Sequence, residues 1–237
     1  MSDPERIIPD ETERGIVALH LKRYEFAQPL CVRRDVLDAG CGVGYGTTFL
    51  AQSARNVVGL DVSADAIEYA RRRYGAPNVE FVVGDVLAMP LPTSQFDVVC
   101  AFETIEHLTD PERFVAEARR VLRQPGVLVA STPRANATDE RPANPFHERE
   151  FSAADFEGLL RSQFSSVELY GQRRLQTARH RVVQRLDVLG LRKRVPFLRG
   201  LGRVVTGTPA MAEVASPDIE IGPSLDGATE VIAVCRP

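Results

Sequence analysis

Short apolar runs rich in β-branched residues alternate with helical patterns along most of this 237-residue chain. Runs of this kind predict strands, and they cover residues 35–39, 56–60, 79–83, 97–101, 127–131, 166–170 and 230–235. The first five runs are apolar almost throughout, which is typical of parallel strands covered by helices on both faces. This alternation predicts a single α/β domain built on an open, doubly wound sheet.

Capping residues indicate where three of the intervening helices begin. Ser63 precedes one helical pattern, and Asp110 stands directly before Pro111, a residue favoured in the first turn of a helix. Ser152 is followed three residues later by Asp155, which resembles a capping box. These signals predict helices that start near residues 64, 111 and 153.

The composition is that of an ordinary globular protein, with 44% hydrophobic and 26% charged residues. No apolar run approaches the ~20 residues needed to cross a bilayer, and the acidic, polar start of the chain is unlike a secretory signal. The four cysteines lack the paired spacing of disulfide or zinc motifs; they are Cys31, Cys41, Cys100 and Cys235. We therefore expect reduced thiols in a cytoplasmic protein.

The chain has a net charge of −3, but it contains one strongly basic segment. Residues 172–203 contain ten Lys and Arg side chains and one acidic residue, Asp187. This segment opens a predicted helical insertion, residues 172–228, between the sixth and seventh strands. A cationic amphipathic segment can contact an anionic membrane peripherally, bind phosphates, connect copies of the chain as a homo-oligomer, or remain a solvated helix.

The strongest chemical signal is the glycine-rich run VLDAGCGVGYG at residues 36–46, which follows a predicted strand and precedes a helical pattern. Gly40, Gly42 and Gly44 allow a tight turn and let the backbone approach a ligand closely. The acid before these glycines, Asp38, would repel a pyrophosphate but attract the ammonium group of an amino-acid moiety.

Two further acids end the next two predicted strands. Asp61 can accept hydrogen bonds from the two hydroxyls of an adenosine ribose. Asp85 can accept from an adenine amino group, while the backbone N–H of Val86 can donate to the adenine ring. Acids at three consecutive strand ends favour a cationic, zwitterionic ligand over the dianionic pyrophosphate of a nicotinamide cofactor.

Residues 34–132 resemble the cofactor loops of class I S-adenosylmethionine-dependent methyltransferases. The resemblance implies a Rossmann-like seven-stranded sheet of order 3-2-1-4-5-7-6 with an antiparallel last strand. It also implies an N-terminal helical lid (1–33) and a core formed by 34–171 and 229–237. The cofactor, which leaves as S-adenosylhomocysteine, would contact Tyr24, Asp38, Gly40, Cys41, Gly42, Gly44, Asp61, Val62, Asp85, Val86 and Glu103.

The lid contains a motif of its own, HLKRYEFA at residues 20–27. It resembles a stretch of methyltransferases often encoded beside glycosyltransferases, where it lies over the cofactor. The resemblance implies that Arg23 or Tyr24 reaches the cofactor carboxylate. A surface arginine and a half-buried tyrosine are the plain alternative.

A cluster of acids and histidine follows the fourth predicted strand. Glu103, Glu106 and His107 are spaced so that one helical turn would gather them, and such ligands can hold Mg²⁺ or Mn²⁺. The pattern resembles metal-dependent O-methyltransferases of quinones and of RNA 3′-terminal 2′-hydroxyls. The RNA enzymes add a second histidine, and His147 has a comparable place. Without a metal, His107 or His147 can act as a general base, or the cluster is structural.

The sequence therefore predicts an O-methyltransferase acting on a small molecule such as a sugar, a glycan or a secondary metabolite, including an anionic acceptor. The chain lacks the N/D-P-P-Y/F motif that resembles amino-group methylation, so hydroxyl acceptors are favoured and nucleic acid is disfavoured. RNA and quinone O-methylation remain alternatives within the family. An NAD-dependent dehydrogenase and a non-catalytic cofactor-binding module are the alternatives outside it.

Overall fold

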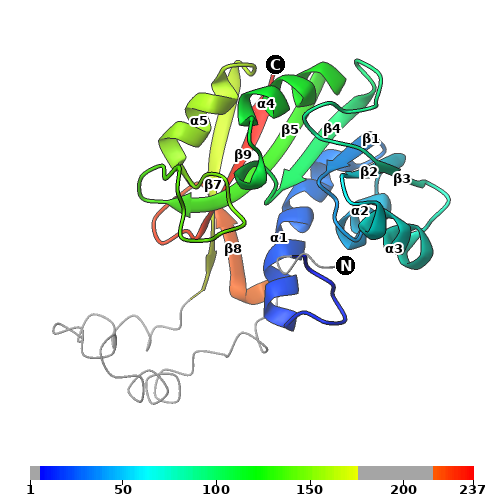
Figure 1. Ribbon diagram of the computed structural model, residues 1–237, viewed down its shortest axis with the longest axis horizontal. Helices are drawn as coiled ribbons and strands as arrows, with labels where there is room; N and C mark the ends of the chain where they lie inside the picture. Colours follow the sequence, from blue (N-terminus) through cyan, green and yellow to red (C-terminus); the bar gives the residue numbers. More distant parts are fainter. Residues whose placement is uncertain (1–5, 176–215) are drawn as a thin grey trace.

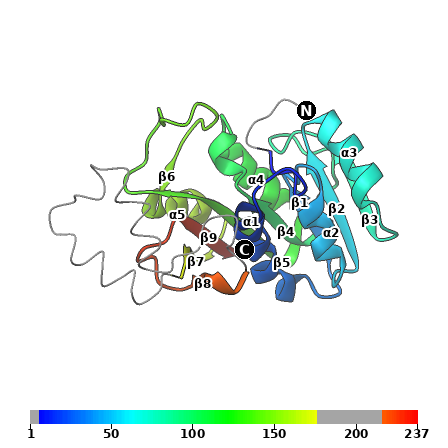
Figure 2. The same cartoon turned by 90° about the horizontal axis from the view of Figure 1, so that it is seen from below.

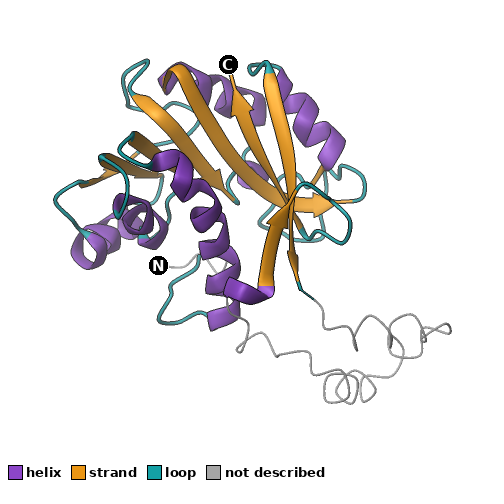
Figure 3. Ribbon diagram, turned by 180° about the vertical axis from the view of Figure 1, so that it is seen from behind, coloured by secondary structure: helices purple, strands orange, loops and turns teal. Residues whose placement is uncertain are grey.

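The computed structural model describes residues 6–175 and 216–237 (Figure 1). A nine-stranded sheet runs through this part of the chain in the order β3-β2-β1-β4-β5-β9-β7-β8, with β6 pairing separately with β5. The strands are β1 (Asp35–Ala39), β2 (Asn56–Asp61), β3 (Val79–Val83), β4 (Phe96–Phe102), β5 (Leu122–Ala135), β6 (Phe151–Ser152), β7 (Ser166–Arg174), β8 (Ile219–Gly222) and β9 (Glu230–Arg236). Figure 3 shows the sheet from behind.

The order of the seven expected strands is confirmed. Strands β1 to β5 are parallel, and β9 is antiparallel to both β5 and β7. Two strands were not predicted: β6 is only two residues long, and β8 extends the sheet beyond β7. Both are too short to give a recognisable alternating pattern.

Helices cover both faces of the sheet (Figure 2). They are α1 (Arg14–Cys31), α2 (Tyr45–Ala51), α3 (Ala64–Tyr74), α4 (Pro111–Val121) and α5 (Ala153–Arg161), with 3-10 turns η1 (Ile105–His107) and η3 (Ser216–Asp218). Alternate residues of β4 explain the two layers. Val98 and Cys100 pack in one apolar cluster with α1 and α2, whereas Val99 and Ala101 pack in another with α4 and α5.

The predicted helix caps are present. Ser63 Oγ accepts a hydrogen bond from the Ala66 amide, and Asp110 accepts one from the Arg113 amide. Ser152 likewise accepts from the Asp155 amide. Each bond satisfies an amide that the first turn of its helix would otherwise leave unpaired.

The described parts of the predicted helical insertion contain no α-helix. Gln172 and Arg173 continue β7, while residues 216–222 form η3 and β8. Arg173 pairs with Glu220 across the two strands at 3.0 Å, and β8 covers an edge of β7 that would otherwise expose unpaired backbone groups. Residues 176–215, which hold most of the basic segment, lie outside the described residues.

Helix α1 is fixed to the core through Tyr24. Its ring lies where the side chain of residue 46 would be, because a Cβ atom added to Gly46 would overlap the ring. The ring also packs edge-on against Phe102, with 4.9 Å between centroids. The predicted lid is therefore anchored at this helix and is not a loosely attached segment.

The described residues bear on the predictions for the cysteines and for membrane-spanning segments. All four cysteines are free and buried. None of the described helices is long and apolar enough to cross a bilayer.

Candidate functional site

A cavity of about 580 Å³ opens at the carboxyl ends of the parallel strands. It is lined by Arg6, Ile7, His20, Tyr24, Gly40, Cys41, Gly42, Val43, Tyr45, Asp61, Val62, Asp85, Val86, Phe102, Glu103, Thr104, Glu106, His107, Leu108, Phe146 and His147. The lining thus contains all the residues expected to bind cofactor except Asp38 and Gly44. Binding crevices of open α/β sheets lie at this edge.

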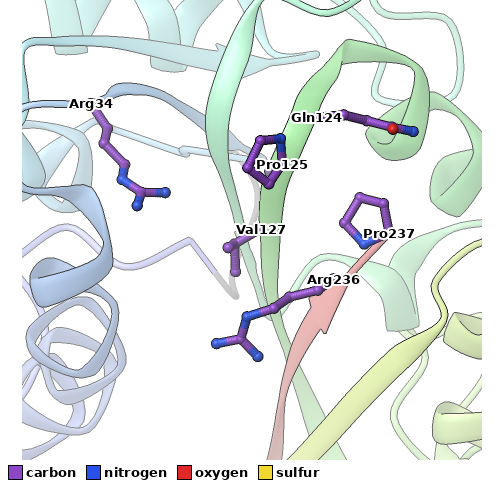
Figure 4. Close-up of a pocket in the computed structure, with 7 residues that line it drawn as sticks. Arg34, Gln124, Pro125, Val127, Arg236 and Pro237 are labelled. Atoms are coloured by element: carbon purple, nitrogen blue, oxygen red, sulfur yellow. The ribbon is translucent and has the colours of Figure 1, made fainter.

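A second hollow of about 620 Å³ lies at the opposite edge of the sheet. Figure 4 shows its lining, which consists of Arg34, Gln124, Pro125, Gly126, Val127, Arg236 and Pro237. This lining offers no acidic, histidine, hydroxyl or thiol side chain that could take a proton or form a covalent bond. The residues that the sequence singled out for cofactor binding and catalysis are absent from this second lining.

The glycine loop is held in shape by backbone geometry and by Asp61. Gly40 and Gly42 have φ angles of +77° and +53°, in the left-handed region that favours glycine. A Cβ at Gly42 would meet no atom within 4 Å, so its face toward the cavity is open. Asp61 Oδ2 accepts from the Gly42 amide at 2.8 Å, and Oδ1 accepts from the Ser63 amide at 2.9 Å.

Asp61 can therefore hold the glycine loop and bind a ligand at the same time. Each carboxylate oxygen has a second lone pair, so Asp61 can still accept hydrogen bonds from a ligand hydroxyl in the cavity. Asp85 is arranged in the same way: its Oδ1 accepts from the Leu87 amide at 2.8 Å while the residue lines the cavity. The two acids predicted to bind ribose and adenine thus reach one cavity on fixed side chains.

Asp38 lies beneath the cavity rather than on its wall. It is only 1% exposed and accepts hydrogen bonds from Thr47 Oγ1 at 2.6 Å and from the Tyr24 hydroxyl at 3.3 Å. Burial raises the pKa of Asp38 to about 7, and the nearby Asp61 charge adds to this effect. Gly44 is also withdrawn: a Cβ there would collide with the Phe81 ring.

This pKa predicts how stability depends on pH. Between about pH 4 and pH 7 the folded protein keeps an Asp38 proton that the unfolded chain loses, so the carboxyl weakens folding as pH rises. Asp38→Asn removes this titration. We expect the Tm of the ligand-free variant, relative to wild type, to increase between about pH 5 and about pH 8. A constant Tm difference in a fluorimetric melt would contradict the raised pKa.

Arg23 is a buried residue rather than a surface one, and it is not among the residues that line the cavity. It is 1% exposed; its Nε donates to Gln172 Oε1 at 3.1 Å, and its Nη1 lies 3.6 Å from Glu103 Oε1. Glu103 also accepts from Ser131 Oγ at 2.9 Å. This buried ion pair connects α1 with the end of β4.

The predicted cluster of Glu103, Glu106 and His107 is wrong in one member, because Glu103 belongs to this ion pair. Glu103 has a left-handed φ of +51°, and the 3-10 turn begins only at Ile105, so no helical turn gathers Glu103 with Glu106 and His107. The residues whose ligand atoms lie within 4.8 Å of one another are Glu106, His107 and His147. Glu103 is held instead by Arg23 and Ser131.

Glu106 is an unusual member of this cluster. It is 1% exposed, and neither carboxyl oxygen has a hydrogen-bond partner among the described residues. Burial, helped by the charge of Glu103, raises the pKa of Glu106 well above its usual range. Burial therefore favours the neutral form of this carboxyl group over the charged form.

Hydrogen bonds define the tautomer of each histidine. His107 Nδ1 lies 2.9 Å from the Phe146 carbonyl oxygen, and His147 Nδ1 lies 3.2 Å from Glu150 Oε1. Both partners accept, so each Nδ1 carries a proton, and in the neutral ring Nε2 then carries the lone pair. The two rings stand nearly perpendicular, with centroids 5.0 Å apart.

His147 reaches the cluster because its loop is bound to the backbone of Glu106. The amides of Glu148 and Arg149 donate to the Glu106 carbonyl at 2.8 and 3.2 Å. Together with the bond between His107 and Phe146, they join two segments about 40 residues apart in the chain. Sequence reasoning had only a resemblance to place His147 here.

Several lining residues were not predicted from the sequence. His20 lines the cavity, and its Nδ1 lies 3.5 Å from Arg23 Nη1; burial and the Arg23 charge lower its pKa well below the usual range. Phe146 lies at the rim and is 47% exposed.

Glu150, the partner of His147, was also not predicted, although the pattern H-x-x-E at 147–150 could have indicated it.

Residues 37–130 match a family model described as a methyltransferase domain. An S-adenosylmethionine-dependent methyltransferase described as probable, from Mycobacterium tuberculosis H37Rv, is 42% identical over 160 residues, covering 66% of this chain and 58% of that protein. This chain therefore spans less than two-thirds of that relative's length.

Two other relatives are informative. A Mycolicibacterium smegmatis protein with the same type of description is 39% identical over 184 residues, which are 71% of each chain. A fatty-acid O-methyltransferase of M. smegmatis is 33% identical, covering 65% of this chain and 55% of its own length.

A solved structure resembles the whole fold. It is a Thermotoga maritima methyltransferase with a TM-score of 0.66 and 18% identity, covering 96% of this chain and 95% of its own. At this identity the likeness concerns the fold alone.

Proposed function

Because this chain belongs to the S-adenosylmethionine-dependent methyltransferases, we propose that it transfers the methyl group of that cofactor to a hydroxyl oxygen of a small molecule. A sugar, a glycan or a secondary metabolite is the class of acceptor we propose. The observation that carries this proposal is that His107 and His147, each bound through Nδ1, line the cavity beside the cofactor loop. An imidazole lone pair can take the hydroxyl proton at neutral pH.

The cavity lining supports a specific arrangement of the cofactor. Asp61 would accept from the ribose hydroxyls and Asp85 from the adenine amino group, and the open face of Gly42 would leave room for the amino-acid moiety. Asp38 would act from beneath the loop through Tyr24 and, in its ionised form, through its charge. His107 and His147 line the same cavity and would meet the acceptor beside the cofactor.

Within this arrangement the reaction is a single displacement. The acceptor oxygen forms a bond to the methyl carbon while the carbon–sulfur bond breaks, and its electron pair stays on sulfur. The hydroxyl proton passes to a histidine Nε2, leaving neutral S-adenosylhomocysteine and an imidazolium. Holding both reactants in one cavity lowers the entropic part of the barrier.

Isotope-labelled methyl transfer tests the acceptor class. We expect transfer to sugar and phenolic hydroxyls, with the label stable to mild alkali as in an ether. The fatty-acid relative makes a carboxyl acceptor the second candidate, and the exposed Phe146 ring at the rim would suit its alkyl chain. Transfer only to carboxylates, giving an alkali-labile ester, would contradict the hydroxyl proposal.

A metal ion is the second candidate for the role of the cluster. The orphaned Glu106 carboxyl and two imidazole lone pairs fit an ion that accepts nitrogen, such as Mn²⁺, better than Mg²⁺, which prefers oxygen ligands. Glu106, His107 and His147 would hold it. A bound ion would lower the pKa of the acceptor hydroxyl.

Chelation separates the two candidates. With Glu103 held by Arg23, the cluster keeps one carboxyl group, and the raised pKa of Glu106 favours its neutral form. We therefore expect turnover in excess EDTA to stay within about twofold of the untreated enzyme, because a histidine base needs no ion. Loss of turnover that added Mn²⁺ restores would contradict the base and support the metal.

A further inference from the structure

The two histidines of the cluster differ in the group that accepts a hydrogen bond from Nδ1. His107 donates to a neutral backbone carbonyl, that of Phe146, whereas His147 donates to the carboxylate of Glu150. A carboxylate on one ring nitrogen stabilises the imidazolium that forms when the other nitrogen takes a proton. This asymmetry distinguishes His147 as the better proton acceptor of the pair.

Glu150 is presented from a fixed backbone. Its amide donates to the Asp139 carbonyl at 2.9 Å, and its carbonyl accepts from the Asp139 amide at 2.9 Å. The next residue, Phe151, begins β6 and pairs with Arg134 of β5. Bonds on both sides of the residue therefore limit where its carboxylate can move.

His147 is enclosed as well as anchored. Its side chain is 10% exposed, while that of Glu150 is 32% exposed. The bonds from Glu148 and Arg149 to the Glu106 carbonyl hold the backbone on the C-terminal side of His147. Because the backbone is held, the ring of His147 can still rotate and change its tautomer. The hydrogen bond to the Glu150 carboxylate restricts both changes.

We propose that Glu150 is a positioning residue that holds His147 in the Nδ1-protonated tautomer, so that His147 rather than His107 takes the proton of the acceptor hydroxyl. The inference rests on the proposed function. During transfer the hydroxyl proton moves to His147 Nε2, the oxygen bonds to the methyl carbon, and the sulfur keeps the electron pair of the broken bond. Glu150 touches neither reactant and acts through the imidazole.

The variant Glu150→Ala tests the proposal, with Glu140→Ala as a matched control. Glu140 is in the same loop, its side chain is 78% exposed, and it approaches Arg149 at 3.7 Å. We expect Glu150→Ala to lower kcat by about 10- to 100-fold, as for residues that orient a functional histidine. The KM for S-adenosylmethionine should change by less than about twofold, and Glu140→Ala should behave like wild type.

Nitrogen-15 NMR of the labelled histidines gives a readout independent of turnover. Wild-type His147 should be protonated at Nδ1, whereas in Glu150→Ala the Nε2-protonated form should become dominant. Glu150→Gln keeps an acceptor oxygen, so it should retain the wild-type tautomer and recover part of the rate. An unchanged tautomer in Glu150→Ala, or an unchanged kcat, would overturn the positioning role.

These outcomes are separable from failure of the proposed function. If Glu150→Ala is fully active while His147→Asn is inactive, the positioning role is wrong and the histidine base stands. If His147→Asn is itself fully active, the proposed base is wrong whatever Glu150 does. Equal Tm values for the Glu150 and Glu140 variants would exclude misfolding as the cause of a lower kcat.

Discussion

Replacing His147 with Asn is expected to lower kcat by about 10²- to 10⁴-fold, the range over which a positioned general base contributes to catalysis. Asn is polar and close in size, but it carries no lone pair able to take a proton at neutral pH. The residue belongs to a loop docked on the Glu106 backbone rather than to the glycine loop. Affinity for S-adenosylmethionine should therefore be nearly unchanged.

The same substitution at His107 provides the comparison. His107 is in the same cluster, but its Nδ1 donates to a neutral carbonyl, so its loss should cost about tenfold in kcat at most. Single-turnover methyl transfer with saturating cofactor measures the chemical step for both variants. Equal losses in the two variants would mean that the histidines act together, and full activity in both would remove the base from the mechanism.

Asp61→Ala should weaken the binding of S-adenosylmethionine by about 100-fold. Hydrogen bonds to a charged group contribute about 1.5–3 kcal/mol each, and 1.4 kcal/mol corresponds to tenfold in affinity. Asp61 also holds the Gly42 amide at 2.8 Å. The variant therefore loses both the ligand contact and the shape of the glycine loop.

Calorimetric titration of the ligand-free protein measures this affinity. Asp61→Asn keeps one acceptor oxygen and should give an intermediate loss. Glu68→Ala, an exposed carboxylate on the adjoining helix α3 that pairs with Arg72, is the control and should leave binding unchanged. Wild-type affinity in Asp61→Ala would show that the ribose lies elsewhere.

The parts of this protein that the sequence predicted well are those defined by local patterns. The glycine loop, Asp61 and Asp85 each lie at or just after the end of a parallel strand, and the ends of adjacent parallel strands meet at one sheet edge. The caps at Ser63, Asp110 and Ser152 depend on residues three positions away. Most of the secondary structure and the location of the cavity could therefore be inferred from local patterns, whereas the strand order was implied by the family resemblance.

The errors arose where distant segments compete for the same side chain. Glu103 has suitable spacing to join Glu106, yet Arg23 from α1 and Ser131 from β5 bind its carboxylate instead. The resemblance placed either Arg23 or Tyr24 near the cofactor carboxylate, and the burial of Arg23 beside Gln172 of β7 could not be read from local spacing. Such preferences are decided by packing between elements far apart in the chain.

The packing of Tyr24 against Gly46 links two positions that should also vary together in evolution. The ring fills the volume that any side chain at position 46 would need, and its hydroxyl donates to Asp38. A relative with alanine or serine at position 46 would have to shorten residue 24, and it would then lose the hydroxyl that reaches Asp38. We expect the tyrosine and the glycine to be inherited as a pair, replaced together or kept together, across the relatives that share this N-terminal helix.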